Sequence, residues 1–288
     1  MPRRPAAARP HRIALNLATT AVAALLLASC VSPSQDADRG ASSADARPMG
    51  HIHAVASDPG SGDVLLATHG GLFRLGPSGT TPVGPAVDLM GFAVAPDGAY
   101  LASGHPGPGT DLDQPVGLIR SEDGGQSWSA VSRAGKSDFH TLTVGPGVVA
   151  GFDGALRVGT DGSSWQQRPI PAPPRTLSAS PSGDRLLATT EQGLLSSEDQ
   201  GRTWAPVATP DLLVTIAWAD ADTLVGVSVT GTLVISEDAG GTWTAGGSVG
   251  QASAVSATRT ADGLDVLLVV GENVVRTTDR GETLERVV

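Results

Sequence analysis

A short turn-like motif recurs along most of this chain, and it constrains the fold more than any other feature. Each copy has a hydroxyl residue, an aspartate two positions later, a glycine two positions further, then a second hydroxyl residue and usually a tryptophan. Four copies align without gaps at 121–128, 197–204, 236–243 and 277–284, and a copy one residue shorter lies at 160–165. The aspartates are Asp123, Asp161, Asp199, Asp238 and Asp279, so the steps are 38, 38, 39 and 41 residues. A period of this length is typical of a repeated four-stranded unit.

The residue types in the motif suit a tight turn between two strands. An aspartate can accept the backbone N–H groups of its own turn, and a glycine can adopt the positive φ that a hairpin turn requires. Short apolar runs with turn residues precede each copy, for example at 92–98 and 100–104. We therefore predict four strands, A to D, in each unit, with the motif at the C–D turn and the tryptophan between neighbouring sheets. These aspartates are predicted to be structural.

The repeat predicts an all-β, six-bladed β-propeller over residues 49–288. Residues 51–75 repeat the A, B and C strands without the motif, which supplies a sixth, degenerate blade. The 240 residues from 49 to 288 then give 40 residues per blade, in agreement with the measured steps. Six blades are therefore favoured over seven, and no long 3.6-residue periodicity indicates helices.

The pattern S-x-D-x-G-x-T-W resembles the Asp box of the bacterial neuraminidase repeat. The resemblance covers nearly the whole chain after its N-terminal segment, and it implies a sialidase-like or glycosyl hydrolase-like exported propeller in which the boxes are scaffold. The chain also resembles exported assembly-factor and sortilin-type propellers, whose blades hold partner proteins.

The N-terminal segment has the order of a secretory signal. Four arginines within the first twelve residues precede the apolar run 21–27, and the sequence Leu-Ala-Ser-Cys ends at Cys30. That ending resembles the lipobox of bacterial lipoproteins, which implies lipidation of Cys30. We predict a lipoprotein signal peptide at 1–29, a disordered lipid-anchored tether at 30–48, and attachment of the exported chain to the outer side of the cell membrane.

Charge and cysteine content exclude several classes of function. Without the four N-terminal arginines, 15 Lys and Arg remain against 29 Asp and Glu, a formal charge of −14. Such a chain should repel nucleic acid. Cys30 is the only cysteine, which excludes an internal disulfide and a cysteine-type structural zinc site.

The histidines mark a candidate metal site on one face. Strand directions alternate, so the A–B and C–D turns should lie on the back face, while the B–C and D–A loops lie on the front. Alignment of the A strands places His51, Met90 and His140 at equivalent positions near the channel, followed by Arg175, Val214 and Ser253. The candidate metal ligands are His51, His53, His69, Met90, His105 and His140. Imidazoles with a thioether suit copper, whereas imidazoles with Asp111, Asp113 or Asp138 suit zinc or another divalent ion. The alternative is that these histidines bond only to loop carbonyls.

Residues for catalysis are harder to find. Sialidases of this kind use an arginine triad, a Phe/Tyr-Arg-Ile-Pro motif and a tyrosine nucleophile, but here Phe73-Arg74 is followed by Leu-Gly and the only tyrosine, Tyr100, is predicted on the back. A glycosidase needs two facing carboxylates. Weak candidates for catalytic carboxylates are Asp111, Asp113 and Asp138. Two further acids, Asp153 and Glu191, also lie on suitable loops. We therefore predict a non-catalytic module that binds a small ligand, glycan, metal or protein at the cell surface, with glycosyl hydrolase as the alternative.

Overall fold

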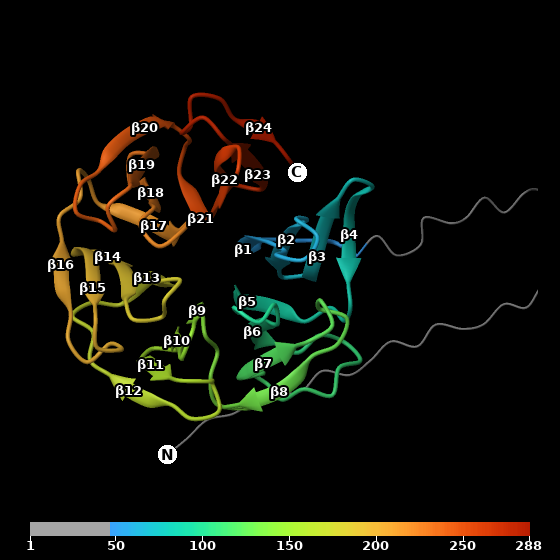
Figure 1. The fold of residues 1–288 in the computed structure, drawn as a ribbon. Helices are drawn as coiled ribbons and strands as arrows, with labels where there is room; N and C mark the ends of the chain where they lie inside the picture. The colour runs from blue at the N-terminus through green and yellow to red at the C-terminus, as the bar shows by residue number, and fades with distance from the viewer. Residues whose placement is uncertain (1–46) are drawn as a thin grey trace, which may run out of the picture. The chain divides into compact units, whose positions relative to one another are not determined.

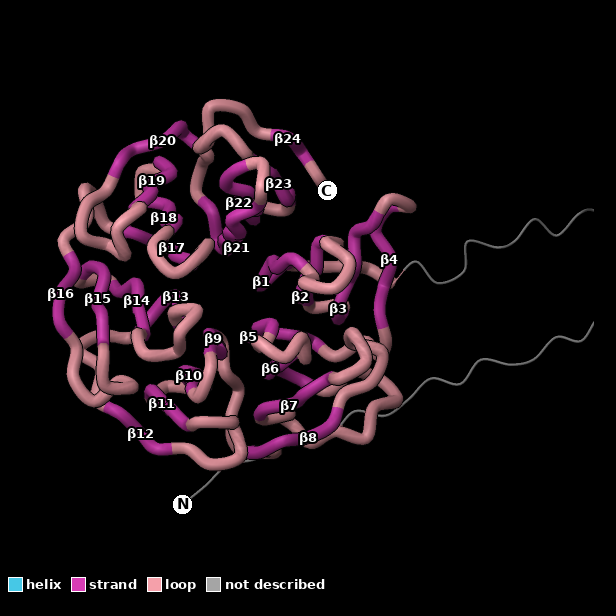
Figure 2. Tube along the Cα trace, in the orientation of Figure 1, coloured by secondary structure: helices cyan, strands magenta, loops and turns pink. Residues whose placement is uncertain are grey.

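A computed structural model describes residues 47–288, which form a ring of six four-stranded antiparallel sheets around a central axis (Figures 1 and 2). The predicted signal peptide, Cys30 and almost all of the predicted tether lie outside the described residues. Among residues 47–288, no helix is long and apolar enough to cross a membrane.

The first three blades occupy the chain from 52 to 168. Blade 1 contains β1 (Ile52–Ser57), β2 (Val64–Thr68), β3 (Gly71–Gly76) and β4 (Gly79–Val83). Blade 2 contains β5 (Asp88–Val94), β6 (Tyr100–His105), β7 (Leu118–Ser121) and β8 (Ser129–Ser132). Blade 3 contains β9 (Thr141–Gly145), β10 (Val148–Phe152), β11 (Leu156–Gly159) and β12 (Gln166–Arg168).

The last three blades follow in the same order. Blade 4 contains β13 (Pro174–Ala179), β14 (Leu186–Thr190), β15 (Gly193–Ser197) and β16 (Ala205–Val207). Blade 5 contains β17 (Leu213–Trp218), β18 (Leu224–Ser228), β19 (Thr232–Ser236) and β20 (Thr244–Ser248). Blade 6 contains β21 (Ala252–Thr260), β22 (Gly263–Val270), β23 (Asn273–Thr277) and β24 (Glu285–Arg286).

Every sheet is built from four strands that are consecutive in the sequence. The first strand of each blade lies nearest the axis, and the fourth lies at the rim (Figure 1). The all-β, six-bladed architecture predicted from the repeat is therefore confirmed. The degenerate repeat at 51–75 forms the first three strands of blade 1.

The recurring motif forms the C–D turn through one set of hydrogen bonds. In blade 2, the Ser121 hydroxyl donates to Asp123 Oδ1 at 2.8 Å and accepts the Gly125 N–H at 2.8 Å, while the Ser127 amide and hydroxyl donate to Asp123 at 2.9 and 2.6 Å. Gly125 has a φ of 91°, a backbone conformation that side chains disfavour. The bonds from Ser127 hold the pKa of Asp123 at about 2. Equivalent bonds surround the aspartates of blades 4, 5 and 6, namely Asp199, Asp238 and Asp279.

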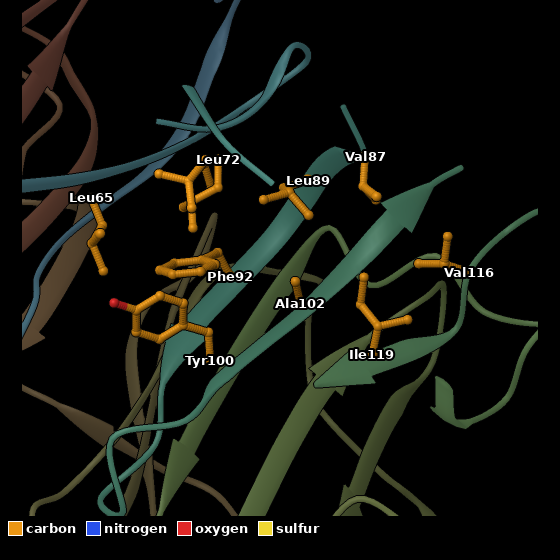
Figure 3. Packing of buried hydrophobic residues seen from close by; sticks show 11 residues of the cluster. Leu65, Leu72, Val87, Leu89, Phe92, Tyr100, Ala102, Val116 and Ile119 are labelled. Carbon is orange, nitrogen blue, oxygen red and sulfur yellow. The ribbon is translucent and has the colours of Figure 1, made fainter. Parts of the chain in front are cut away.

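The shorter motif copy in blade 3 also forms a hydrogen-bonded turn, and the motif tryptophans pack between blades. Asp161 Oδ1 accepts the amide and hydroxyl of Ser163 at 2.9 and 2.7 Å. The motif tryptophans pack against hydrophobic clusters that join neighbouring blades, which are Trp128, Trp165, Trp204 and Trp243. One such cluster, between blades 1 and 2, is shown in Figure 3, where the rings of Phe92 and Tyr100 lie with their centroids 5.5 Å apart.

Blades 1 and 6 close the ring by side-chain packing rather than by sharing a sheet. Phe73, Ile52 and Leu66 of blade 1 are buried in one cluster with Leu267 and Val269 of blade 6. Arg47 packs against blade 1 beside this seam, with its guanidinium 5.3 Å from the Phe73 ring centroid. Its Nη1 also donates to the Gly84 carbonyl at 3.0 Å. Because no strand of blade 1 joins the sheet of blade 6, the ring is held closed at this seam by side-chain packing.

A partly buried ionic network on the back face joins blades 1 and 2. The Tyr100 hydroxyl donates to Asp58 Oδ2 at 2.8 Å, and the Arg74 guanidinium bonds to both Asp58 and the Tyr100 oxygen. Although burial opposes ionisation, the hydrogen bonds from Tyr100, the Gly60 amide and Arg74 hold the pKa of Asp58 at about 2. Burial and the bond to Asp58 raise the pKa of Tyr100 to about 12. Arg74 and Tyr100 therefore have a structural role far from the front face.

We expect Tyr100→Phe to change the stability of the propeller at high pH. The folded pKa of Tyr100 lies above its unfolded value of about 10, so its contribution is complete below pH 10 and is lost as the pH rises from 10 to 12. Between pH 9 and 11.5 the parent chain should lose about 2 kcal/mol of unfolding free energy through this group. Urea denaturation at both pH values measures the loss. The window is clean because the chain has one tyrosine and one lysine, Lys136.

The variant supplies the comparison. Tyr100→Phe should be about 1–2 kcal/mol less stable at pH 7, because Asp58 loses one hydrogen-bond donor, and it should lack the alkaline loss. If the unfolding free energies of the two proteins fall equally with pH above pH 10, the Tyr100–Asp58 bond does not cause the alkaline loss of stability.

Candidate functional site

The innermost strands begin at the front face with a one-residue irregularity. In blade 1, Ile52 pairs with Thr68 but Ala54 pairs with Ala67, so His53 is the additional residue of a β-bulge. The same shift leaves Met90, Arg175, Val214 and Ser253 as the bulge residues of blades 2, 4, 5 and 6. In blade 3 the pairing begins at Thr141, and His140 precedes it at the same position. The bulge residues of blades 1, 2, 4 and 6, together with His140 of blade 3, line the channel around the axis.

This register corrects the alignment drawn from the sequence. His51 was aligned with Met90 and His140, but the structure places His53 at that position. Blade 1 lacks the motif from which the other blades are counted, and its C–D turn is short, so the period could not fix its register. The equivalence of Met90 and His140 with Arg175, Val214 and Ser253 was correct.

The bulge residues surround the mouth of a channel along the axis. The channel has a volume of about 330 Å³ and is lined at its front end by His53, Met90, His140, Arg175 and Ser253. Among the described residues that line it there is no aspartate or glutamate. The channel itself therefore does not present the two facing carboxylates of a glycosidase.

Three side chains converge at the seam between blades 1 and 2. His53 Nε2 lies 3.4 Å from His69 Nδ1, and His69 Nδ1 lies 3.0 Å from Asp88 Oδ1. The third separation, His53 Nε2 to Asp88 Oδ1, is 3.9 Å. The ring of His51 stands edge-on to that of His53, with centroids 4.9 Å apart. We call His53, His69 and Asp88 the first triad, and they form a group whose ligand atoms could hold a metal ion.

Backbone hydrogen bonds fix the first triad. The His69 amide donates to the His51 carbonyl at 3.1 Å, which ties the B–C turn to the start of the innermost strand. The Thr68 hydroxyl donates to the Gly71 carbonyl at 2.8 Å within the same turn. Asp88 begins β5 and pairs directly with His105 of β6. Two residues of the triad, His53 and Asp88, thus lie on strands, and His69 lies in a two-residue turn rather than on a long loop.

The surroundings keep His53 neutral. Burial lowers its pKa to about 4, and repulsion from His69, His51 and His140 acts in the same direction, while Asp88 opposes it. Neutral imidazole is the form that binds metal ions. At neutral pH, His53 is therefore uncharged, and its Nε2 faces His69 and Asp88.

A second group of the same residue types lies at the seam between blades 2 and 3. His140 Nε2 lies 2.7 Å and His105 Nε2 lies 3.3 Å from the same atom, Asp138 Oδ2. We call His105, Asp138 and His140 the second triad. Gly91 permits this close approach of blades 2 and 3, because a Cβ there would stand 2.3 Å from the Phe139 carbonyl oxygen.

The other predicted acids lie outside both triads. Asp111 and Asp113 are exposed on the loop between β6 and β7. Asp153 is paired with Arg157 at 2.7 Å and accepts the Ser137 hydroxyl at 2.6 Å, which indicates a structural role. Glu191 is exposed at the front of blade 4. Of the weak catalytic candidates, only Asp138 joins a cluster.

Asp88 is the site residue that sequence reasoning missed. The bulge register makes it equivalent to His51 and Asp138, each lying two residues before a bulge residue. The triplets His-Ile-His, Asp-Leu-Met and Asp-Phe-His at 51–53, 88–90 and 138–140 carry this signal. A correct alignment of the three triplets would have found it.

Comparison with known proteins supports the fold and defines the class of protein as a β-propeller. Residues 150–283 match the model of a family described as the DUF6242 beta propeller domain. No curated protein matches the chain. The matched span begins within β10 of blade 3 and ends at the C–D turn of blade 6, so it contains none of the residues of either triad.

Solved structures with this fold have varied descriptions. The chain resembles YCF48 bound to D1 peptide, with 17% identity, a TM-score of 0.52, and coverage of 83% of this chain and 82% of that one. It also resembles a chain of a nidogen/laminin complex, with 15% identity, a TM-score of 0.60, and coverage of 75% and 89%. It resembles an ancestral GH74 enzyme as well, with 16% identity, a TM-score of 0.54, and coverage of 83% of this chain and 39% of that one. At these identities the likeness concerns the fold alone.

Proposed function

We propose that this chain is an exported, lipid-anchored, Asp-box propeller that acts as a non-catalytic binding module, and that its binding face is the front rim of blades 1–3. The observation that carries the proposal is the gathering of five histidines and two aspartates at one side of the channel mouth, which are His51, His53, His69, Asp88, His105, Asp138 and His140. Blades 4–6 place Arg175, Val214 and Ser253 at the bulge positions instead.

The first triad has the donor types and spacing of a transition-metal site. A tetrahedral ion with bonds of about 2.0–2.1 Å places its ligands about 3.3 Å apart. The three separations in the triad are 3.0, 3.4 and 3.9 Å. Two imidazoles and one carboxylate leave a fourth position for water or an external ligand. The set suits zinc or copper, and Met90 at the next bulge position would add a thioether that favours copper.

Neighbours with this fold include both binding proteins and an enzyme. They include YCF48 with a bound D1 peptide and a chain of a nidogen/laminin complex. They also include a gluconolactonase from Xanthomonas campestris. The absence of facing carboxylates among the channel-lining residues favours binding over glycoside hydrolysis for this chain.

Export and anchoring rest on the N-terminal sequence. The arginines, the apolar run 21–27 and the placement of the only cysteine at the end of Leu-Ala-Ser-Cys support processing at Cys30. Attachment through that residue would hold the propeller at the outer surface of the cell membrane.

Titration with metal ions tests the binding proposal. The full-length chain, purified through a tag without histidine and freed of metal by a chelator, is titrated with Zn²⁺ and separately with Cu²⁺ by calorimetry. Loss of an outer-shell partner typically costs 10–100-fold in metal affinity, so His69→Ala, which removes a direct ligand, should weaken one binding event at least about 100-fold.

Asp111→Ala is the matched control, because Asp111 is an exposed acid on the same face but outside both triads. Its affinities should equal those of the parent within the error of the titration. A parent chain that takes up neither ion, or a His69→Ala variant that binds like the parent, would contradict the proposal.

A further inference from the structure

The seam between blades 4 and 5 lies across the ring from the first triad (Figure 1). Blades 1 and 4 share one register, because the bulge of blade 4 follows Pro174 as the bulge of blade 1 follows Ile52. The residues that replace the first triad at this seam can therefore be read from the repeat. In the order of bulge residue, B–C residue and residue two before the next bulge, they are Arg175, Glu191 and Leu212.

These three residues line one pocket on the front face. Its volume is about 340 Å³, which lies at the lower end of the range of about 300–1,000 Å³ that is usual for small-molecule sites. Apart from Arg175, Glu191 and Thr190, every residue of its lining is apolar. The apolar residues are Pro173, Leu212, Leu213, Val214 and Val229. The lining thus combines one positive charge, one negative charge and an apolar surface.

Hydrogen bonds within each blade fix the walls of this pocket. In blade 4, the Thr190 hydroxyl donates to the Gly193 carbonyl at 2.9 Å, which closes the turn that carries Glu191. In blade 5, the Val229 amide donates to the Leu212 carbonyl at 2.8 Å, which holds the two apolar residues side by side. The Thr190 hydroxyl is therefore engaged within the protein, and the polar side chains that remain for a ligand are the two charged ones.

The two charges of the pocket do not neutralise each other. Arg175 and Glu191 are both exposed, and neither takes part in an ion pair within residues 47–288. A ligand with only a carboxylate would be repelled by Glu191, and a ligand with only an ammonium group would be repelled by Arg175. A small zwitterion satisfies both side chains.

From this combination we propose that the pocket binds a free α-amino acid with an apolar side chain. The Arg175 guanidinium binds the carboxylate, because its N–H groups match the two carboxylate oxygens. The Glu191 carboxylate binds the ammonium group, and the ligand side chain lies against Leu212, Val214 and Val229. This site shares no residue with the first triad and does not rest on metal binding there.

Calorimetric titration of the full-length chain with L-leucine tests the proposal. A chelator is present throughout, so that metal ions play no part. We expect one binding event, which Arg175→Gln and Glu191→Gln should each weaken at least about 10-fold, because each removes a charge-assisted hydrogen bond to the ligand. Arg202→Gln is the matched control, since Arg202 is an exposed arginine of the same blade on the back-face turn, and it should bind leucine like the parent. Thermal unfolding confirms that the variants fold.

Analogues of leucine test the three parts of the site separately. 4-Methylpentanoate lacks the ammonium group, and 3-methylbutylamine lacks the carboxylate. Each should bind at least about 10-fold more weakly than leucine, because one charged side chain of the pocket is left without its partner. Glycine keeps both charges but buries no apolar side chain, so its affinity should fall at least about 10-fold as well.

Several results would overturn the amino-acid site. The first is a parent chain that does not bind leucine, and the second is an Arg175→Gln variant that binds it like the parent. Equal affinities for leucine and 4-methylpentanoate would also overturn it, because the pocket would then not recognise the ammonium group. None of these results bears on the first triad, which is tested separately by titration with Zn²⁺ and Cu²⁺.

Discussion

Cys30→Ser is expected to abolish lipid attachment completely. The acylated atom in lipoproteins of this kind is the cysteine sulfur, and this chain has no other cysteine that could replace it. Cells that express the parent chain and are fed an alkyne-labelled fatty acid should yield a labelled protein in the membrane fraction. The variant should carry no label and should leave that fraction, because no other anchor is proposed.

A neighbouring substitution separates acylation from a general effect on export. Ser34→Ala changes a residue four positions after Cys30 and should leave both label and location unchanged. An unlabelled parent chain, or a Cys30→Ser variant that is still labelled, would contradict the proposed anchor.

The second large effect concerns the closure of the ring. Phe73→Ala should lower the unfolding free energy by about 3–5 kcal/mol, the usual cost of truncating a buried aromatic residue. Phe73 is 4% exposed and packs with Leu267 and Val269 across the seam between blades 6 and 1. Because the seam has no shared sheet, other contacts there offer little compensation. Urea denaturation measures the loss.

Leu284→Ala is the control for this prediction. Leu284 is 41% exposed, although it occupies the last position of a motif copy, so its truncation should change stability by no more than about 0.5 kcal/mol. If Phe73→Ala costs less than about 1 kcal/mol, the seam does not depend on this packing.

The repeat allowed the fold to be predicted because its information is local. An aspartate such as Asp123 accepts bonds only from residues within four positions of itself, so the motif marks a turn wherever it occurs. Its spacing then fixes the size of the blade, and the blade count follows. The same local logic identified the front-face histidines as a group.

The composition of the triads could not be predicted in the same way. A bulge adds one residue to a strand, and blade 1 has no motif from which to count, so His51 was placed where His53 lies. Asp88 was missed because its partner, His69, belongs to another blade and meets it only when the ring closes. The buried Oδ1 of Asp138 has no hydrogen-bond partner within residues 47–288, which is likewise a property of packing between blades rather than of any one segment.

Diffraction from crystals grown with zinc tests the central claim most directly, namely that the front rim of blades 1–3 is a metal-binding surface. Data collected at the zinc absorption edge locate each ion through its anomalous signal. We predict a peak about 2.0–2.2 Å from His53 Nε2, His69 Nδ1 and Asp88 Oδ1. Crystals that contain zinc elsewhere but show no peak at this triad would contradict the claim.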